Sequence, residues 1–162
     1  MNRLTPTRSI SNPTLSDVTK AMVSFAHKGK QDLEVRRLCE QICEELAQGD
    51  YAGECLAIYH WVCQNIRYMR DIHDVEFVKE PVQLLKTRAG DCDDMATLLA
   101  AMLMSMGNRC DFVLARFRGS PVPSHVYVRV FSPKGPIVLD PVANRDTNRM
   151  LQQLTGYQVV PV

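Results

Sequence analysis

Apolar residues recur at every third or fourth position through much of the first half of the chain. This spacing is typical of the buried face of an amphipathic helix, and it predicts helices over residues 32–47 and 52–66. The loop between them is short, so the two helices are expected to pack as an antiparallel pair. A weaker pattern predicts an earlier helix over residues 15–26, with Ser16 as its N-cap.

The most apolar segment of the chain runs from residue 91 to residue 106 and has almost no polar face beyond its first turn. A helix that is apolar nearly all round is buried inside its protein. Asp91 stands where an N-cap belongs, and Asp94 three residues later resembles the second half of a capping box. The pattern therefore predicts a buried central helix with Cys92 in its first turn, after a short helix over residues 81–87.

After the central helix the apolar residues alternate with a period of two, which predicts antiparallel strands over residues 111–118, 125–131, 137–140 and 157–160. Helices followed by strands indicate an α+β fold. We expect a helical N-terminal half, with the buried central helix carrying the cysteine, packed on a C-terminal antiparallel β-sheet. Residues 1–14, rich in Ser, Thr, Asn and Pro, are expected to form an extended arm, and residues 15–162 a single domain.

The composition, 46% hydrophobic and 23% charged residues, is that of a soluble globular protein. A net charge of +1 gives no basic stripe for nucleic acid, and no segment approaches the length of a membrane span. The N-terminus lacks the apolar run of a secretory signal, so we expect a cytoplasmic protein, placed in the host cytoplasm or the virion if it is phage-encoded. In that reducing compartment the six cysteines should be thiols.

The hairpin between the second and third predicted strands brings two polar residues together. If Phe131 pairs with Pro136 across the turn, then Tyr127 faces Asp140. Side chains alternate between the two faces of a strand, so His125 shares the face of Tyr127. His125 and Asp140 are therefore predicted to be diagonal neighbours within reach of a hydrogen bond.

These residues suit thiol chemistry. Cys92 at a helix N-terminus is favoured as a thiolate by the free N–H groups and the helix dipole, although the neighbouring carboxylates oppose this and a cationic partner is needed. His125 could take the thiol proton, and Asp140 could orient the imidazole, as in a catalytic triad. The Cys92 backbone N–H is a natural oxyanion donor. The candidates for a second donor are Trp61, Gln64 and Asn65.

Each residue alone has a more common structural explanation, and two metal sites compete. Cys39, Cys43, His60 and Cys63 could lie at one level of the helix pair, as ligands of structural zinc. The cysteines fall on the apolar stripes, however, so core packing explains them better. The acidic run from Asp91 to Asp94 lacks the spacing of a calcium loop, and capping explains it better. We therefore expect no metal and no cofactor.

The motifs GDCDDMATLLAAMLMSMG, SHVYVRV and VLDPV, in that order, resemble the transglutaminase-like superfamily, whose fold is that of papain-type cysteine proteases. The segments NIRYMRD and EPVQLLKTRAG resemble the stretch before the family's cysteine, so the likeness covers roughly residues 32–141. It implies that Cys92 is the nucleophile, His125 the base and Asp140 the third member of a triad. Small stand-alone members of this type occur in bacteria and tailed phages.

The resemblance implies a cysteine protease or amidase that acts on a peptide or protein substrate through an acyl-enzyme. Acyl transfer to an amine by the same triad is the first alternative. A non-catalytic module of an assembly, such as a phage particle whose other components hold the N-terminal arm, is the second. The sequence does not resemble the large calcium-regulated transglutaminases outside the motif, which favours hydrolysis over cross-linking.

Overall fold

The computed structural model describes residues 8–11, 14–70, 75–143 and 146–162. Its helices are α1 (Leu15–Lys30), α2 (Leu33–Cys43), α3 (Tyr51–Asn65), α4 (Pro81–Thr87), α5 (Cys92–Ser105) and α6 (Thr147–Gln152). Its strands are β1 (Arg8–Ser11), β2 (Arg67–Tyr68), β3 (Val75–Val78), β4 (Ala89–Gly90), β5 (Cys110–Phe117), β6 (His125–Ser132), β7 (Gly135–Leu139) and β8 (Leu154–Pro161).

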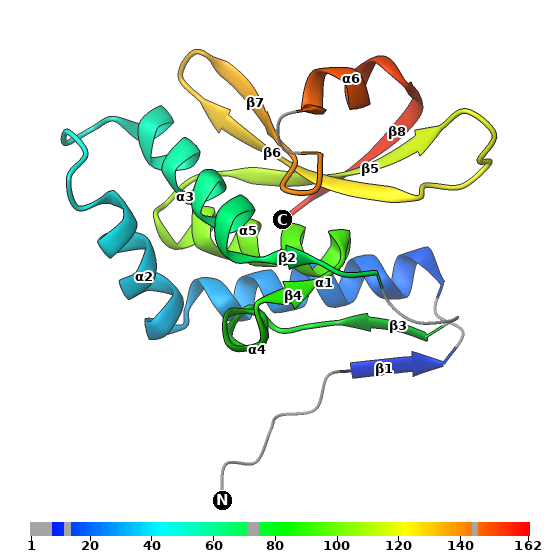
Figure 1. Ribbon diagram of the computed structural model, residues 1–162, viewed down its shortest axis with the longest axis horizontal. Coiled ribbons are helices and arrows are strands. Elements are labelled where there is room, and N and C mark those ends of the chain that lie inside the picture. Colours follow the sequence, from blue (N-terminus) through cyan, green and yellow to red (C-terminus); the bar gives the residue numbers. More distant parts are fainter. Residues whose placement is uncertain (1–7, 12–13, 71–74, 144–145) are drawn as a thin grey trace, which may run out of the picture.

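The architecture is layered and confirms the predicted α+β class. A four-stranded antiparallel sheet in the order β7-β6-β5-β8 forms one layer. Helix α5 lies beneath this sheet and α1 lies below α5, while α6 covers the opposite face of the sheet (Figure 1). The central helix is thus enclosed between the sheet and another helix.

Helix α5 is the centre of the core because its sequence has no polar side to expose. Ala96 and every residue from Leu98 to Leu103 are completely buried. Val126, Val128 and Val130 on the inner face of β6 belong to the same cluster, together with Phe112 of β5. A rigid, fully packed α5 fixes the position of its N-terminal residue, Cys92.

The hairpin register is the predicted one. Phe131 pairs with Pro136, and Val128 pairs with Leu139 further along the two strands. The inner and outer faces therefore follow the predicted alternation, with Tyr127 in a second, smaller cluster on the outer face. This cluster packs against Met150 and Leu151 of α6. The sequence pattern did not predict this helix.

Several details differ from the sequence predictions. Helix α1 extends to Lys30, and its N-cap is Thr14, in a capping box with Asp17, rather than Ser16. Residues 8–11 of the predicted arm form β1, which pairs with β3 of the same chain; residues 1–7 and 12–13 of the arm lie outside the described residues. A second two-stranded sheet joins β2 to β4. These strands have only two to four residues, too few to establish a period.

The helices also bear on the membrane prediction. None of them, within the part of the chain that the structure describes, combines the length and the apolar character needed to cross a bilayer.

Candidate active site

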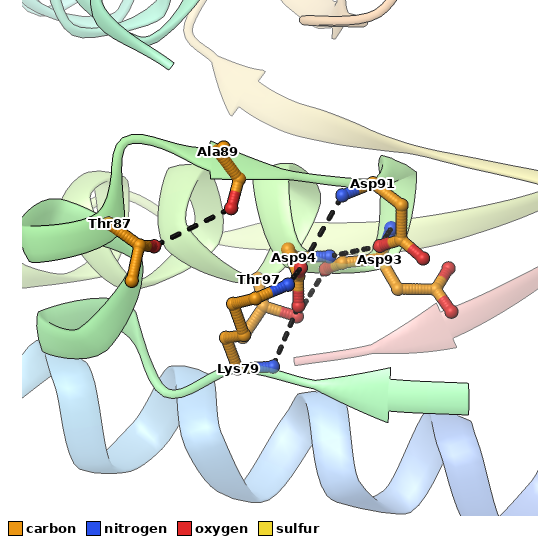
Figure 2. A network of polar contacts seen from close by, with 7 residues as sticks. All are labelled: Lys79, Thr87, Ala89, Asp91, Asp93, Asp94 and Thr97. Atoms are coloured by element: carbon orange, nitrogen blue, oxygen red, sulfur yellow. Dashed lines mark hydrogen bonds and ion pairs between the residues drawn. The ribbon is translucent and has the colours of Figure 1, made fainter. Parts of the chain in front are cut away.

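The N-terminus of α5 is capped as the sequence predicts. The Asp91 carboxylate accepts hydrogen bonds from the backbone N–H groups of Asp93 and Asp94, each at 3.1 Å. The Asp91 N–H in turn donates to the Asp94 carboxylate at 3.4 Å, which completes a capping box. The network in Figure 2 also includes the Thr97 hydroxyl, which donates to the Asp93 carbonyl at 2.7 Å. Cys92 is held at the first position of the helix by bonds on both sides of it.

Gly90 is required by the close packing beneath this cap. A Cβ atom at Gly90 would lie 2.6 Å from Asp94 Oδ2 and 2.9 Å from a methyl group of Leu84. The Gly90 carbonyl also accepts the Met69 N–H at 2.8 Å, because β4 pairs in parallel with β2. This pairing brings the segment after β2 alongside the start of α5.

Asp94 does more than cap the helix. Its carboxylate is completely buried and accepts two bonds from Lys79: one from the backbone N–H, at 2.7 Å, and one from the ammonium group. Figure 2 shows Lys79 reaching this carboxylate from the segment that follows β3. The ion pair therefore ties the strand β3 to the helix that carries Cys92. No feature of the sequence pattern had indicated Lys79.

His125 and Asp140 meet as the hairpin register predicts. The His125 Nε2–H donates to Asp140 Oδ2 at 2.6 Å, and the Asp140 carboxylate is completely buried. The other carboxylate oxygen accepts the N–H groups of Val142 and Ala143, each at 3.0 Å. Since Asp140 occupies Nε2, the Nδ1 atom of the imidazole is left for other partners.

Cys92 and His125 line the same cavity, of about 650 Å³. It lies where the N-terminus of α5 meets the beginning of β6, and the Val126 backbone hydrogen-bonds to the Cys92 thiol. Asp140 stands behind His125, out of solvent. The complete lining is Leu15, Val18, Tyr68, Arg70, Asp91, Cys92, Asp93, Leu114, Val122, Pro123, Ser124, His125 and Val126.

The described residues that line the cavity do not include the three upstream candidates for a second oxyanion donor, Trp61, Gln64 and Asn65. The Asn65 amide donates instead to the Trp61 carbonyl at 2.9 Å, and the Trp61 ring stacks on the Arg88 guanidinium. The upstream residues that do line the cavity are Tyr68 and Arg70, which the β2–β4 pairing brings there. The motif NIRYMRD contained both residues, but a two-residue parallel strand leaves no periodic signal.

The electrostatics of the thiol favour its neutral form. Burial raises the pKa of Cys92 well above its ordinary value, and the carboxylates of Asp93 and Asp91 raise it further. The Cys92 Sγ–H donates to Asp93 Oδ1 at 3.6 Å, while the Val126 backbone acts in the opposite direction. The helix N-terminus alone therefore does not generate a thiolate, and a base within the cavity is needed.

Asp93→Asn is expected to speed alkylation of Cys92 at pH 7. Removal of the carboxylate charge lowers the thiol pKa, so more thiolate is present at a pH below that pKa. The net gain is roughly threefold per pKa unit, because a less basic thiolate is also a weaker nucleophile. Mass spectrometry of the Cys92 peptide after timed iodoacetamide treatment gives the rate. Glu34→Gln, at the exposed first turn of α2, is the matched control, and equal rates in both variants would contradict the prediction.

The structure also bears on the two metal alternatives. Among the described residues, no three His, Cys, Asp or Glu side chains gather so that they could hold a metal ion. Cys39 is completely buried, and its thiol donates to the Met102 carbonyl of α5 at 3.6 Å. Burial raises the pKa of this thiol to about 11. Cys39 is thus a core residue, and the Asp91–Asp94 carboxylates serve the cap and Lys79.

The model of the transglutaminase-like superfamily matches residues 37–141. No curated protein matches the chain. Similar solved structures include a candidate cysteine protease from Cytophaga hutchinsonii, with 17% sequence identity and a TM-score of 0.58. The match covers 94% of this chain and 49% of the protease. A candidate protease from Parabacteroides distasonis has 13% identity and a TM-score of 0.60, and the match covers 76% of this chain and 26% of that one. The periplasmic domain of TgpA from Pseudomonas aeruginosa, bound to ethylmercury, has 16% identity and a TM-score of 0.54, and the match covers 79% of this chain and 52% of that one.

At these identities the solved structures share only their fold with this chain, which spans between about a quarter and a half of their length. The family match is of a different kind. It extends over about two thirds of the chain and includes Cys92, His125 and Asp140. With the predicted fold present around these residues, the chain belongs to the transglutaminase-like superfamily.

Proposed function

We propose that the chain is a thiol-dependent hydrolase that cleaves a peptide or amide bond with Cys92, His125 and Asp140 as its triad. One observation carries the proposal. Cys92 and His125 line a single cavity, and a buried carboxylate holds the histidine through Nε2 at 2.6 Å. A nucleophile, a base and a group that orients the base are the three components that such catalysis requires.

In the proposed reaction each of the three residues has one role. His125 Nδ1 accepts the thiol proton as Cys92 Sγ attacks the substrate carbonyl, and the imidazolium that forms is stabilised by Asp140. Collapse of the tetrahedral intermediate breaks the C–N bond, and His125 returns the proton to the leaving amine. Water, activated by the same imidazole, then hydrolyses the thioester to a carboxylic acid and restores the thiol.

The start of α5 supplies a donor for the oxyanion. The Asp91 side chain takes the N–H groups of Asp93 and Asp94, and the Met95 N–H donates to the Asp91 carbonyl at 3.0 Å. Among the described first-turn residues, the Cys92 N–H is the donor that these bonds leave for a ligand. It lies next to the sulfur atom, so it suits an oxyanion formed on the attacked carbonyl. The Tyr68 hydroxyl, from another wall of the cavity, is the candidate for a second donor.

Hydrolysis in ¹⁸O-labelled water tests the proposal and separates it from acyl transfer. Unstructured peptides are incubated with the protein, with and without a primary amine such as glycine ethyl ester, and an acid quench preserves any acyl adduct for mass spectrometry. We expect an acyl adduct on Cys92 and products with ¹⁸O at a new carboxyl group. Products that carry only the added amine would assign acyl transfer instead, and the absence of both adduct and product would contradict catalysis.

That last outcome would favour the alternative of a non-catalytic module, such as a component of a phage particle. The main reason to consider it is the expectation that a partner holds the N-terminal arm. Residues 8–11 of the arm, however, pair with β3 of the same chain, so this part needs no partner to hold it. We also propose a cytoplasmic location, a reducing compartment in which the six free cysteines would remain thiols.

A further inference from the structure

A second cavity, of about 580 Å³, adjoins the one that contains Cys92. It is bounded by one side of α1 and by strands β5 and β8, and we call it the α1–β8 recess. Leu15 and Leu114 line both cavities, so the two cavities lie side by side. The complete lining of the recess is Leu15, Ser16, Thr19, Lys20, Val23, Ser24, Leu114, Gln158 and Val160.

The recess differs in chemistry from the cavity beside it. Leu15, Val23, Leu114 and Val160 give it apolar walls, and the Thr19 hydroxyl is already bonded to the Leu15 carbonyl at 2.6 Å. Among the described residues that line it, Lys20 is the single charged side chain. The cavity with Cys92, by contrast, contains the carboxylates of Asp91 and Asp93. The reaction therefore takes place in polar surroundings, next to a compartment suited to an apolar group.

Exposed apolar side chains continue this surface around the mouth of the Cys92 cavity. Leu15 is 41% exposed, Tyr68 43% and Val122 61%, and all three line that cavity. Large exposed apolar residues grouped around a polar site are typical of surfaces that bind other molecules. Their grouping favours a substrate that extends beyond the bond being cleaved, rather than a small amide.

The position of β8 suits an extended chain. Strand β8 is at the edge of the four-stranded sheet, paired on one side with β5. Gln158 and Val160, two residues apart on β8, both line the recess, so they project to the same face. An extended peptide laid along this edge presents alternate side chains to that face, which is how edge-binding domains achieve specificity.

We propose that the α1–β8 recess is a specificity pocket that takes a bulky aliphatic or aromatic side chain of a peptide substrate, a few residues from the bond that Cys92 attacks. The inference rests on the proposed function and names its substrate class. Selectivity comes from the apolar walls, because a charged side chain that enters between them would lose its hydration, and a cationic one would find no carboxylate among the described lining residues. Lys20 at the rim disfavours a cationic neighbour on the substrate.

The test uses Cys92→Ala, which can bind but not cleave. A library of randomised heptapeptides is selected for binding to this variant, and the affinities of enriched peptides are then measured by fluorescence anisotropy. The measurement is repeated with Ser24→Trp added, which fills the recess from an exposed position of α1, and with Ser24→Glu added, which introduces a charge there. His27→Trp, an exposed position of the same helix outside the lining, is the matched control.

We expect the enriched peptides to share one bulky apolar residue at a fixed position. Their affinity should fall at least about tenfold in both Ser24 variants and remain unchanged in His27→Trp. The absence of binding peptides, the absence of an apolar preference, or an affinity unaffected by both Ser24 changes would overturn the proposal. If the peptides bind as expected but the wild-type protein does not cleave them, the recess stands and the hydrolase function fails.

Discussion

Replacement of Cys92 by alanine is expected to reduce peptide turnover by at least about 10⁴-fold, to the background that binding and oxyanion contacts alone provide. The sulfur atom forms the covalent intermediate, so no other group in the cavity replaces it. Cys92 is only partly buried, and alanine suits the first turn of a helix. The free energy of unfolding should therefore change by about 1 kcal/mol or less.

Turnover of Cys92→Ala and of Cys43→Ala, measured with the same peptide, checks this expectation. Cys43 is a half-buried thiol at the end of α2, it does not line the cavity, and burial raises its pKa. Its replacement should leave turnover unchanged. A Cys92→Ala protein that is folded and retains more than about a tenth of the activity would exclude covalent catalysis at this residue.

Lys79→Met is expected to lower the free energy of unfolding by about 3–5 kcal/mol. The Asp94 carboxylate is completely buried, and the Lys79 ammonium group is its cationic partner in the ion pair. Methionine fills a similar space but leaves the negative charge of the Asp94 carboxylate uncompensated in the interior. Because the pair joins the β3 segment to the start of α5, the loss should also reduce the order around Cys92.

Urea denaturation of three variants measures this effect. Lys28→Met is the matched control, since Lys28 pairs with Glu80 at 2.7 Å but its side chain is 61% exposed. An exposed pair of this kind contributes at most about 1 kcal/mol. Addition of Asp94→Asn to Lys79→Met should recover part of the loss by removing the buried charge. An equal decrease in the free energy of unfolding in Lys28→Met and Lys79→Met would contradict the stabilising role of the buried ion pair.

The sequence predicted the central helix and the contact between His125 and Asp140 because each depends on a local rule. The capping box requires only Asp91 and Asp94, three residues apart, and the apolar composition of α5 requires burial. The contact between His125 and Asp140 follows from one short hairpin whose register two residues define. In these places the pattern within a few residues determined the structure.

Elsewhere the structure depends on contacts between distant segments, which a single pattern does not specify. Strand β2 exists because it pairs with β4, and this pairing brings Tyr68 and Arg70 to the cavity. Lys79 lies 15 residues from the aspartate it neutralises. The recess needs α1 beside the last strand of the sheet, from opposite ends of the chain. Neither periodicity nor composition encodes these approaches.

The rate of Cys92 alkylation by iodoacetamide against pH, in wild type and in His125→Ala, tests most directly whether the thiol and the imidazole act as a pair. Mass spectrometry assigns the site among the six cysteines. We expect wild-type Cys92 to react near neutral pH. Without His125, burial and the carboxylates of Asp93 and Asp91 keep the thiol pKa raised, so the reaction should require a pH above the ordinary thiol range of about 8.5. Superimposable profiles for the two proteins would contradict the pairing of Cys92 with His125.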